Sequence, residues 1–231
     1  MPTYNESENL AKMIPALREA VPEADLLIVD DSSPDGTAQV VQGFMENDDA
    51  VHLLSRPAKS GLGGAYREGF RWGIDHGYDA LVEMDADFSH DPEQLPSLLA
   101  AAAGGAGLVI GSRYVAGGTI PKWSWQRTML SKGGNLYSSA LLGLNVKDAT
   151  AGFRVYSPEA LGLIGYQEVT LDGYGFQVEM TYRARRAGVK ILEVPISFVD
   201  REVGESKMSG SIVVEALVMV TRRGIGRLFG R

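Results

Sequence analysis

Short apolar runs alternate with longer helical patterns through the first half of the chain, and this alternation constrains the fold more than any other feature. The sequence predicts strands over 25–30, 51–55, 79–85 and 107–113. Strands that alternate with helices are typical of a doubly wound α/β sheet in which most strands are parallel. Ligands of such sheets bind beyond the carboxyl ends of the strands, so we expect functional residues directly after these runs.

Helical patterns fill the intervals and continue through the second half. Asp91 followed by Pro92 is a common helix start. The expected helices are 35–47, 61–77, one beginning at Asp91, 125–143 interrupted by Gly133-Gly134, 174–188 and the last segment; further strands are expected at 148–156 and 189–199, with loops at 114–124 and 200–210. Pro195 lies inside the last expected strand and indicates an edge position or a bulge.

Composition narrows the class of protein. The chain has 231 residues, which suits one domain or one domain with a small appendage, and 45% of them are hydrophobic. It contains no cysteine, which excludes disulfides, cysteine-based zinc sites and thiol catalysis. The net charge of −7 argues against a nucleic-acid surface as the main function.

The sequence predicts neither a signal peptide nor a membrane span. Residues 1–10 are polar and acidic, so we expect no signal peptide. The longest apolar stretch, 212–220, contains Glu215 and is too short to cross a bilayer. We therefore expect a soluble or peripheral protein.

The start of the sequence raises a question about the fold. Residues 2–6, PTYNE, look like the loop that follows a first strand, yet no strand precedes them. Either the domain starts one strand late, or the recorded chain lacks its natural beginning. We therefore expect the first strand of the sheet to be missing.

Two aspartates follow the expected strand 79–85. Asp85 and Asp87 form an Asp-Ala-Asp sequence at the binding edge, and carboxylate oxygens at such a place suit Mg²⁺ or Mn²⁺. The alternative is a solvated acidic turn that caps the following helix through Asp91. The residues alone leave both interpretations open.

Two further stretches lie at the same kind of position. Residues 29–36, VDDSSPDG, close the first expected strand with carboxylates that can hold a base or a ribose, or that form an ordinary turn. Residues 56–65, RPAKSGLGGA, join a basic pair to a glycine-rich helix start. Backbone N–H groups there can face a phosphate, although such a turn is also found as a simple tight connection.

Taken together, these stretches carry a family resemblance. PTYNE, VDDSSPDG, KSGLGGA and DAD resemble the motifs of the family 2 glycosyltransferases, in the same order and at similar spacing. In the second half, GSRY, WQRTMLSKGGN, DATAGFRVY, GYGFQVEM and REVGESKMS resemble the polyprenol-phosphate mannose synthases. The similarity covers nearly the whole chain.

The resemblance implies a GT-A fold, Rossmann-like with a mainly parallel sheet flanked by helices, over residues 1–210. It implies inverting transfer of mannose from GDP-mannose to a polyprenyl (dolichyl) phosphate, with Mg²⁺ or Mn²⁺ as cofactor. Asp85 and Asp87 would hold the metal and the diphosphate. This sequence departs from the family pattern at Ser89, where relatives often have a glutamine at the metal. The implied nucleotide-binding residues are Pro2, Tyr4, Glu6, Asp31, Lys59, Gly61 and Asp85.

An anionic acceptor needs cationic and hydroxyl partners. Arg127 and Ser131 are four residues apart and share one face of a helix, and with Arg113 they match the family's acceptor-phosphate cluster. Arginine suits this task because its planar fork matches phosphate oxygens. The alternative for Arg127 is a solvated surface charge. The expected catalytic residues are Asp87, Arg113, Arg127 and Ser131.

The roles that we expect of other polar residues are less specific. Arg201 and Lys207 lie in a polar loop that we expect to close over the phosphates, the alternative being a mobile surface loop. Arg154 either serves the site or braces its loop. His90 is expected to be structural or solvated, and Glu179 to lie on a helix face near the site.

The lipid acceptor implies contact with a membrane. Residues 211–231 are expected to form a C-terminal amphipathic, basic helix, and 222–231 holds four arginines and no acid. A segment of this kind lies readily in the interface of an anionic membrane, or it is a packed helix with a frayed basic end. The expected location is the cytoplasmic side of a membrane, reached peripherally or through a membrane-embedded partner subunit.

Two other functions are alternatives to mannose transfer to a polyprenyl phosphate. One is transfer of glucose from UDP-glucose to the same lipid. The other is a catalytically silent nucleotide-binding or scaffold subunit, which the missing first strand would favour. A processive polysaccharide synthase is disfavoured because no Gln-x-x-Arg-Trp motif is present.

Phosphate monoesters have a second pKa of about 6, so the acceptor needs no strong general base.

Overall fold

The structure is a computed structural model that describes residues 1–59, 61–200 and 210–228. Its first sheet contains β1 (Pro2–Thr3), β2 (Leu26–Asp30) and β3 (Val51–Ser55) in the order β1-β2-β3. All of its neighbouring strands are parallel, with Pro2 opposite Val29 and Leu26 opposite Val51. The first two residues of PTYNE therefore form the short strand β1 themselves.

A second sheet contains β4 (Leu81–Glu83), β5 (Leu108–Ser112), β6 (Arg154–Tyr156) and β7 (Ile191–Pro195) in the order β4-β6-β5-β7. β6 runs antiparallel to both of its neighbours, whereas β5 and β7 are parallel. Because β7 pairs with β5 alone among the described strands, Pro195 lies on an edge strand, as its position in the sequence predicts.

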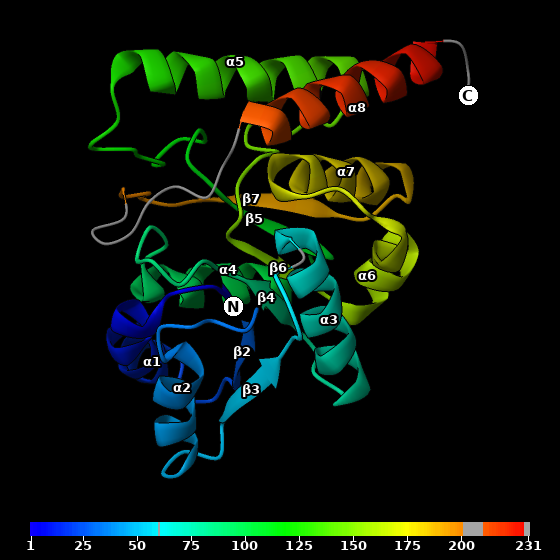
Figure 1. Ribbon diagram of the computed structural model, residues 1–231. Coiled ribbons are helices and arrows are strands. Elements are labelled where there is room, and N and C mark those ends of the chain that lie inside the picture. Colours follow the sequence, from blue (N-terminus) through cyan, green and yellow to red (C-terminus); the bar gives the residue numbers. More distant parts are fainter. Residues whose placement is uncertain (60, 201–209, 229–231) are drawn as a thin grey trace.

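Helices cover both sheets. They are α1 (Ser7–Ala20), α2 (Thr37–Met45), α3 (Leu62–Asp75), α4 (Leu95–Ala103), α5 (Trp125–Leu142), α6 (Pro158–Ile164), α7 (Gly173–Arg186) and α8 (Gly210–Leu228), with short 3₁₀ turns at Pro92–Gln94 and Tyr166–Glu168. In Figure 1, α7 lies on one side of the sheet that holds β5 and β7 and α4 lies on the other. Helices α5 and α8 form an outer layer over α7.

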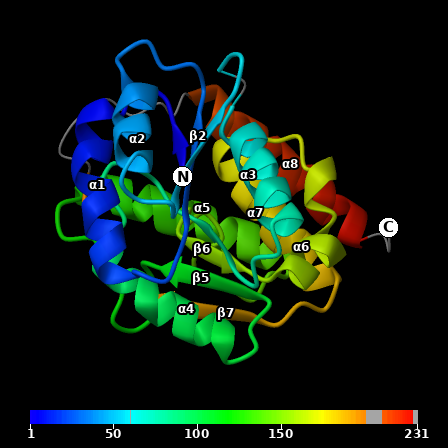
Figure 2. The same ribbon diagram turned by 90° about the horizontal axis from the view of Figure 1, so that it is seen from below.

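The core consists of two clusters, one on each side of the sheets. One joins Tyr66 and Phe70 of α3 to Phe176 of α7. The other joins α1, through Leu10 and Met13, to α4 and β2. In Figure 2, α1 lies at the left and α4 at the bottom, and α3 and α6 lie at the right, with β5 and β6 between them.

Two expectations about secondary structure were wrong, and two helices, α1 and α6, were missed. Helix α1 was not predicted, although its buried residues Leu10, Met13, Ile14 and Leu17 recur at helical spacing. Helix α5 runs without interruption through Gly133 and Gly134. Ser124 caps its start by accepting a hydrogen bond from the backbone N–H of Arg127 (3.3 Å), and Gly143 ends it in the left-handed conformation.

The other wrong expectation is the strand at 148–156, of which only 154–156 pairs in the sheet. The guanidinium of Arg154 is fully buried and donates hydrogen bonds to the carbonyls of Ala151 (2.7 Å from Nε) and Ala149 (2.6 Å from Nη2). Since these carbonyls turn toward the arginine, residues 148–153 form a loop wrapped around it. Arg154 therefore braces the loop, which settles the choice that the sequence left open.

Candidate active site

The turns that follow three strands share an unusual backbone geometry. Asn5, Ser32 and Phe88 come shortly after β1, β2 and β4 and have φ values of 57°, 53° and 59°. The left-handed region is unfavourable for residues other than glycine, and non-glycine residues held there cluster at functional sites. The conformation at Phe88 turns the chain directly after Asp87.

The predicted nucleotide residues Tyr4 and Lys59 meet. The Lys59 ammonium lies 4.2 Å from the centre of the Tyr4 ring, a distance at which the cation is attracted to the ring face. These residues follow β1 and β3, at the two sides of the first sheet. A base or ribose bound at this edge would therefore find an aromatic ring and a cation together.

Asp31 is paired with Arg56, a residue that the sequence did not predict as part of the site. Arg56 Nη1 lies 2.6 Å from Asp31 Oδ1, and both side chains are buried. The same guanidinium contacts the carbonyl of Gly61 (3.4 Å) and the carboxylate of Glu68 (3.1 Å). Arg56 thus ties the loop after β2 to the glycine-rich turn that begins α3.

Gly61 lies where another residue would not fit. Its φ is +87°, and an added Cβ would lie 2.3 Å from the carboxylate of Asp172. That carboxylate accepts a hydrogen bond from the backbone N–H of Gly63 (2.9 Å). The expectation that the N–H groups here face a phosphate is therefore wrong for Gly63, whose N–H is taken by an aspartate from the start of α7.

Pro2 and Glu6 lie at the two ends of the PTYNE segment. Pro2 pairs with β2, and the following Thr3 donates a hydrogen bond to Asp30 (3.0 Å). Glu6 precedes α1, and its carboxylate accepts from the amide of Asn9 (2.7 Å). The segment is thus fixed against β2 on one side and α1 on the other.

The three aspartates that follow β4 differ in their exposure and in their hydrogen bonds. The side chain of Asp85 is 38% exposed, while Asp87 is buried and accepts hydrogen bonds from the backbone N–H (3.0 Å) and the hydroxyl of Ser89. Asp91 instead caps the following 3₁₀ turn by accepting from the N–H of Glu93 (3.0 Å). The expected capping role of Asp91 is confirmed.

Asp85 and Asp87 fit a hard divalent cation by their chemistry. Two carboxylates, completed by water and by phosphate oxygens of a ligand, are a usual Mg²⁺ arrangement, and Mn²⁺ accepts the same donors. Ser89 holds Asp87 through two donors, so the carboxylate has a fixed orientation. Within the described residues there is no group of three or more Asp, Glu or His side chains placed to hold a metal.

His90 is buried and structural. Its ring stacks on Phe153 with centroids 5.0 Å apart, and Nδ1 accepts a hydrogen bond from the backbone N–H of Asp85 (3.2 Å). Burial lowers the pKa of His90, so the ring is neutral near pH 7 and its 3.9 Å approach to the Asp85 carboxylate is not an ion pair. His90 therefore positions the backbone of Asp85.

Arg113, one of the residues predicted for the acceptor, follows β5 and is buried. Its Nε and Nη2 lie 2.7 and 2.6 Å from the two carboxylate oxygens of Asp148, and Nη2 also reaches the hydroxyl of Thr150 (2.9 Å). The rings of Trp123 and Phe198 lie 5.6 and 5.5 Å from Cζ. Arg113 is thus held rigidly, with Asp148 as a partner that the sequence did not reveal.

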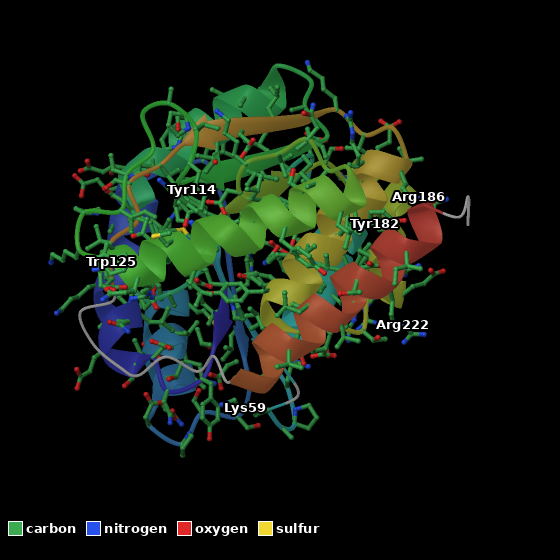
Figure 3. All side chains as sticks on the ribbon, turned by 90° about the horizontal axis from the view of Figure 1, so that it is seen from above. Lys59, Tyr114, Trp125, Tyr182, Arg186 and Arg222 are labelled. Atoms are coloured by element: carbon green, nitrogen blue, oxygen red, sulfur yellow. The ribbon has the colours of Figure 1, made fainter. Side chains whose placement is uncertain are left out.

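Arg127 and Ser131 share the first half of α5, as their spacing predicts. Arg127 is half exposed, lies 3.9 Å above the Trp123 ring and pairs with both oxygens of Asp200 (2.8 and 3.0 Å). Ser131 accepts a hydrogen bond from the hydroxyl of Tyr114 (2.7 Å), which lies next to α5 in Figure 3. Arg201 and Lys207 lie outside the described residues.

Two buried carboxyl groups lie behind the site. Glu83, at the end of β4, is fully buried, and burial raises its pKa to about 8. Glu179 lies on α7, where one carboxylate oxygen contacts Arg183 (2.9 Å) and Arg223 (2.7 Å). Glu179 therefore joins α7 to α8 and is not part of the nucleotide edge.

A doubly wound sheet that presents paired carboxylates beyond β4 and a cationic cluster beyond β5 defines an α/β enzyme of the GT-A class. The family described as Glycosyl transferase family 2 matches residues 1–164. Two curated relatives match almost the full length, and both are enzymes of sugar transfer. The chain belongs to glycosyl transferase family 2 and is a glycosyltransferase.

The first relative is the undecaprenyl-phosphate mannosyltransferase of Micrococcus luteus, 56% identical over 225 residues, which are 97% of this chain and 92% of the relative. The second is the polyprenol monophosphomannose synthase of Mycolicibacterium smegmatis, 50% identical over 230 residues, or 99% and 87% of the two chains. Among solved structures, glucosyl-3-phosphoglycerate synthase of Mycobacterium tuberculosis, in complex with Mn²⁺, UDP-glucose and phosphoglyceric acid, matches with a TM-score of 0.69. That match has 19% identity and covers 96% of this chain and 77% of the other; it is a likeness of fold.

Proposed function

We propose that this glycosyltransferase moves mannose from GDP-mannose to a polyprenyl phosphate, with inversion at the sugar carbon and with a divalent cation. The observation that carries the proposal is the cationic and hydroxyl cluster of Arg113, Arg127 and Ser131 beyond β5, in a chain at least half identical to two relatives named for this kind of transfer.

In this proposal the acceptor phosphate is itself the nucleophile. Near pH 7 a phosphate monoester is largely dianionic, because its second pKa is about 6. One of its oxygens forms a bond to the anomeric carbon of mannose while the bond from that carbon to the diphosphate breaks, and GDP leaves. No proton has to be removed in this step, so the residues act mainly by positioning.

Arg127 and Ser131 are the groups that we assign to the acceptor phosphate. Arg127 is half exposed and already holds an anionic partner, the Asp200 carboxylate, in a two-oxygen contact of the kind that a phosphate can replace. Ser131 stands one helical turn further along α5. Arg113, which is paired with Asp148, is the third residue that we assign to the acceptor phosphate.

On the donor side, Tyr4, Lys59 and Asp31 are assigned to the nucleotide, with Pro2, Glu6 and Gly61 shaping the same edge. Asp85 and Asp87 are assigned to the metal. A bound Mg²⁺ or Mn²⁺ would neutralise the charge that develops on the leaving diphosphate. The orientation of Asp87 by Ser89 and of the Asp85 backbone by His90 supports this assignment.

The acceptor lipid requires a membrane surface, and we assign this contact to the outer layer of α5 and α8. On α5, Trp125, Met129, Leu130 and Leu136 are more than 60% exposed, and on α8 Val214 and Val218 are more than half exposed. Helix α5 contains no acidic residue and includes Arg127 and Lys132. Apolar and basic residues on one face suit an anionic bilayer interface.

Figure 3 shows Trp125 at the outer end of α5, on the same layer as α8. No helix among the described residues has the length and apolar character needed to span a bilayer. We therefore propose a peripheral contact on the cytoplasmic side, made directly or with a membrane-embedded partner.

UDP-glucose is the competing donor. It is named with the structure that resembles this chain at 19% identity, a likeness that concerns the fold alone. The two relatives at 50% and 56% identity are both named for mannose. Mannose is therefore the donor sugar that we propose.

The anomeric configuration of the product tests the mechanism. The lipid product made from GDP-α-mannose is isolated and the one-bond carbon–hydrogen coupling of the anomeric carbon is measured by NMR. The proposal expects the β-anomer, and expects its formation to stop on chelation and to resume on addition of Mg²⁺ or Mn²⁺. The α-anomer would contradict inversion, and formation in a chelator would contradict the metal.

A further inference from the structure

Tyr114 joins the second sheet to helix α5 at the acceptor cluster. It follows Arg113 at the end of β5, and its half-buried side chain reaches the first half of α5, where its hydroxyl lies 2.7 Å from Ser131 Oγ. Figure 3 shows Tyr114 beside α5. The contact therefore links the strand end that carries Arg113 to a residue that we assign to the acceptor phosphate.

The Tyr114 side of this contact is held by its neighbours in the chain. The backbone N–H of Arg113 donates to Asp148 (3.0 Å), and the Arg113 guanidinium binds both oxygens of the same buried carboxylate. The backbone N–H of Tyr114 donates to the Ser112 hydroxyl (3.4 Å). Because the backbone around it is fixed, Tyr114 presents its hydroxyl at a defined place.

The Ser131 side is held by a second contact one helical turn further along α5. The side chain of Asn135 donates to the hydroxyl of Thr150 (3.0 Å) and accepts from the backbone N–H of Thr150 (3.2 Å). The Thr150 hydroxyl in turn accepts from Arg113 Nη2 (2.9 Å). This part of α5 is thus tied to Arg113 by two routes, one through Tyr114 and one through Asn135 and Thr150.

The hydrogen bond between Tyr114 and Ser131 has a direction. Burial raises the pKa of Tyr114 above its ordinary value of 10.0, so the phenol keeps its proton near pH 7 and donates to Ser131 Oγ. A serine hydroxyl has one hydrogen and two acceptor lone pairs. Among the described residues Ser131 Oγ has no second partner, so its own hydrogen can be given to a ligand.

The ring of Tyr114 makes contacts that are separate from its hydroxyl. Arg113 Cζ lies 5.3 Å from the ring centre, and the ammonium of Lys132, the residue after Ser131, lies 5.7 Å from it. Cations at such distances are attracted to the ring face. A phenylalanine at position 114 would keep these contacts and lose the hydroxyl alone.

We propose that Tyr114 is a positioning residue for the acceptor phosphate, which acts by donating to Ser131 Oγ and directing the Ser131 hydrogen to a phosphate oxygen. The inference rests on the proposed function, in which Ser131 and Arg127 bind that phosphate. Hydrogen bonds that run in one direction polarise one another, so Ser131 becomes a stronger donor than an isolated serine. Tyr114 itself does not touch the substrate in this arrangement.

Tyr114→Phe tests the inference in the full chain, with a short, water-soluble polyprenyl phosphate as acceptor and saturating GDP-mannose. The KM for the acceptor is expected to rise about 5- to 10-fold, because the bond from Ser131 to phosphate is weakened. The kcat should stay within about twofold, since a contact made equally with the substrate and the transition state changes KM alone. The Kd for GDP, measured by calorimetry, should stay the same.

Tyr137→Phe is the matched control from the same helix. The Tyr137 hydroxyl lies 2.9 Å from Thr221 Oγ1 and joins α5 to α8, so this variant also removes one hydroxyl that holds α5. Both variants should lower the Tm by a similar amount, about 2–4 °C, and Tyr137→Phe should leave the KM unchanged. Equal changes of the acceptor KM in the two variants would overturn the inference, because Tyr114 would then only brace α5.

Ser131→Ala provides the second test. Alone it should raise the acceptor KM at least about fivefold, and Tyr114→Phe should add less than twofold in that background, because the hydroxyl that Tyr114 orients is gone. The same fold-change from Tyr114→Phe with and without Ser131 would overturn the positioning role and leave the proposed function intact. An unchanged acceptor KM in both Ser131→Ala and Arg127→Ala would contradict the acceptor site itself, and the inference with it.

Discussion

Arg113 and Asp148 form a two-pronged ion pair inside the protein, with Nε and Nη2 lying 2.7 and 2.6 Å from the two carboxylate oxygens. The backbone N–H of Arg113 also donates to Asp148 (3.0 Å). The pair joins the end of β5 to the loop before β6. It fixes the chain that leads to Tyr114, the hydroxyl partner of Ser131.

Asp148→Asn is expected to destabilise the protein by about 3–5 kcal/mol, because it leaves the buried Arg113 guanidinium without a counter-charge. The loss is measured by denaturant unfolding. Asp48→Asn is the control, because Asp48 pairs with Arg18 at a more exposed position and should change the Tm by no more than about 2 °C. Equal losses of stability in the two variants would show that the buried pair contributes no more to stability than the more exposed pair.

Asp87→Ala is expected to lower transfer by at least about a thousandfold while the Tm changes little, because its carboxylate is assigned to the metal and the leaving group. Asp91→Ala is the matched control from the same acidic run. It removes a cap and should cost about 1 kcal/mol of stability with activity kept. Retained transfer in Asp87→Ala would refute the metal role.

Arg127→Ala is expected to raise the KM for the lipid phosphate about 10- to 100-fold, since a charge-assisted hydrogen bond to phosphate is lost. The Kd for GDP, measured by calorimetry, should stay nearly constant. Arg186→Ala is the control, because Arg186 is exposed and donates to Tyr182 on α7. Similar losses in lipid and nucleotide binding would identify Arg127 as a structural arginine.

Leu130→Asp is expected to reduce binding to vesicles that contain anionic lipid by about 10- to 100-fold, because α5 would lose a side chain that inserts into the interface. Leu163→Asp introduces the same charge at an exposed leucine of α6, away from the outer layer, and should bind as the unsubstituted chain does. Vesicle sedimentation measures both. Equal binding by both variants would exclude α5 as the membrane contact.

In a chain that begins at Met1, the buried amine of this residue predicts that stability depends on pH. Its pKa is lowered from 8.0 to about 5 in the folded state, so between these values the unfolded chain takes up a proton that the folded chain does not. The stability linked to this group is complete above pH 8 and is lost as the pH falls toward 5. The full difference is on the order of 4 kcal/mol.

Comparison with an N-terminally acetylated chain isolates this contribution, since the carboxyls that interact with the amine, Asp85 and Glu83, are the same in both proteins. The free-amine chain should lose stability relative to the acetylated one as the pH is lowered from about 8 to about 5. Parallel Tm curves across that range would mean that the amine is solvated in the folded protein.

The sequence predicted the strands well where each is a short apolar run bounded by turn residues. Val51–Ser55 matches its expected range, and Leu26–Asp30 differs by one residue. The strand over 148–156 failed because its shape depends on a buried arginine whose carbonyl partners no local pattern reveals. The missed α1 is different, because the spacing of its buried residues could have identified it.

The predicted site residues are those whose role depends on local position. Asp85 and Asp87 follow a strand, and Arg127 and Ser131 are one helical turn apart. Their partners could not be predicted, because each contact joins distant parts of the chain. The examples are Arg113 with Asp148, Gly63 with Asp172 and Arg127 with Asp200, separated by 35, 109 and 73 residues.

The most direct measurement is the mass of the lipid product formed by the purified chain. The chain is incubated with Mg²⁺ and a short polyprenyl phosphate, with GDP-mannose in one reaction and UDP-glucose in a parallel one. We expect a lipid heavier by one hexose from GDP-mannose, no such product from UDP-glucose, and none after chelation. A product formed only from UDP-glucose would contradict the proposed donor, and no product from either would contradict the proposed reaction.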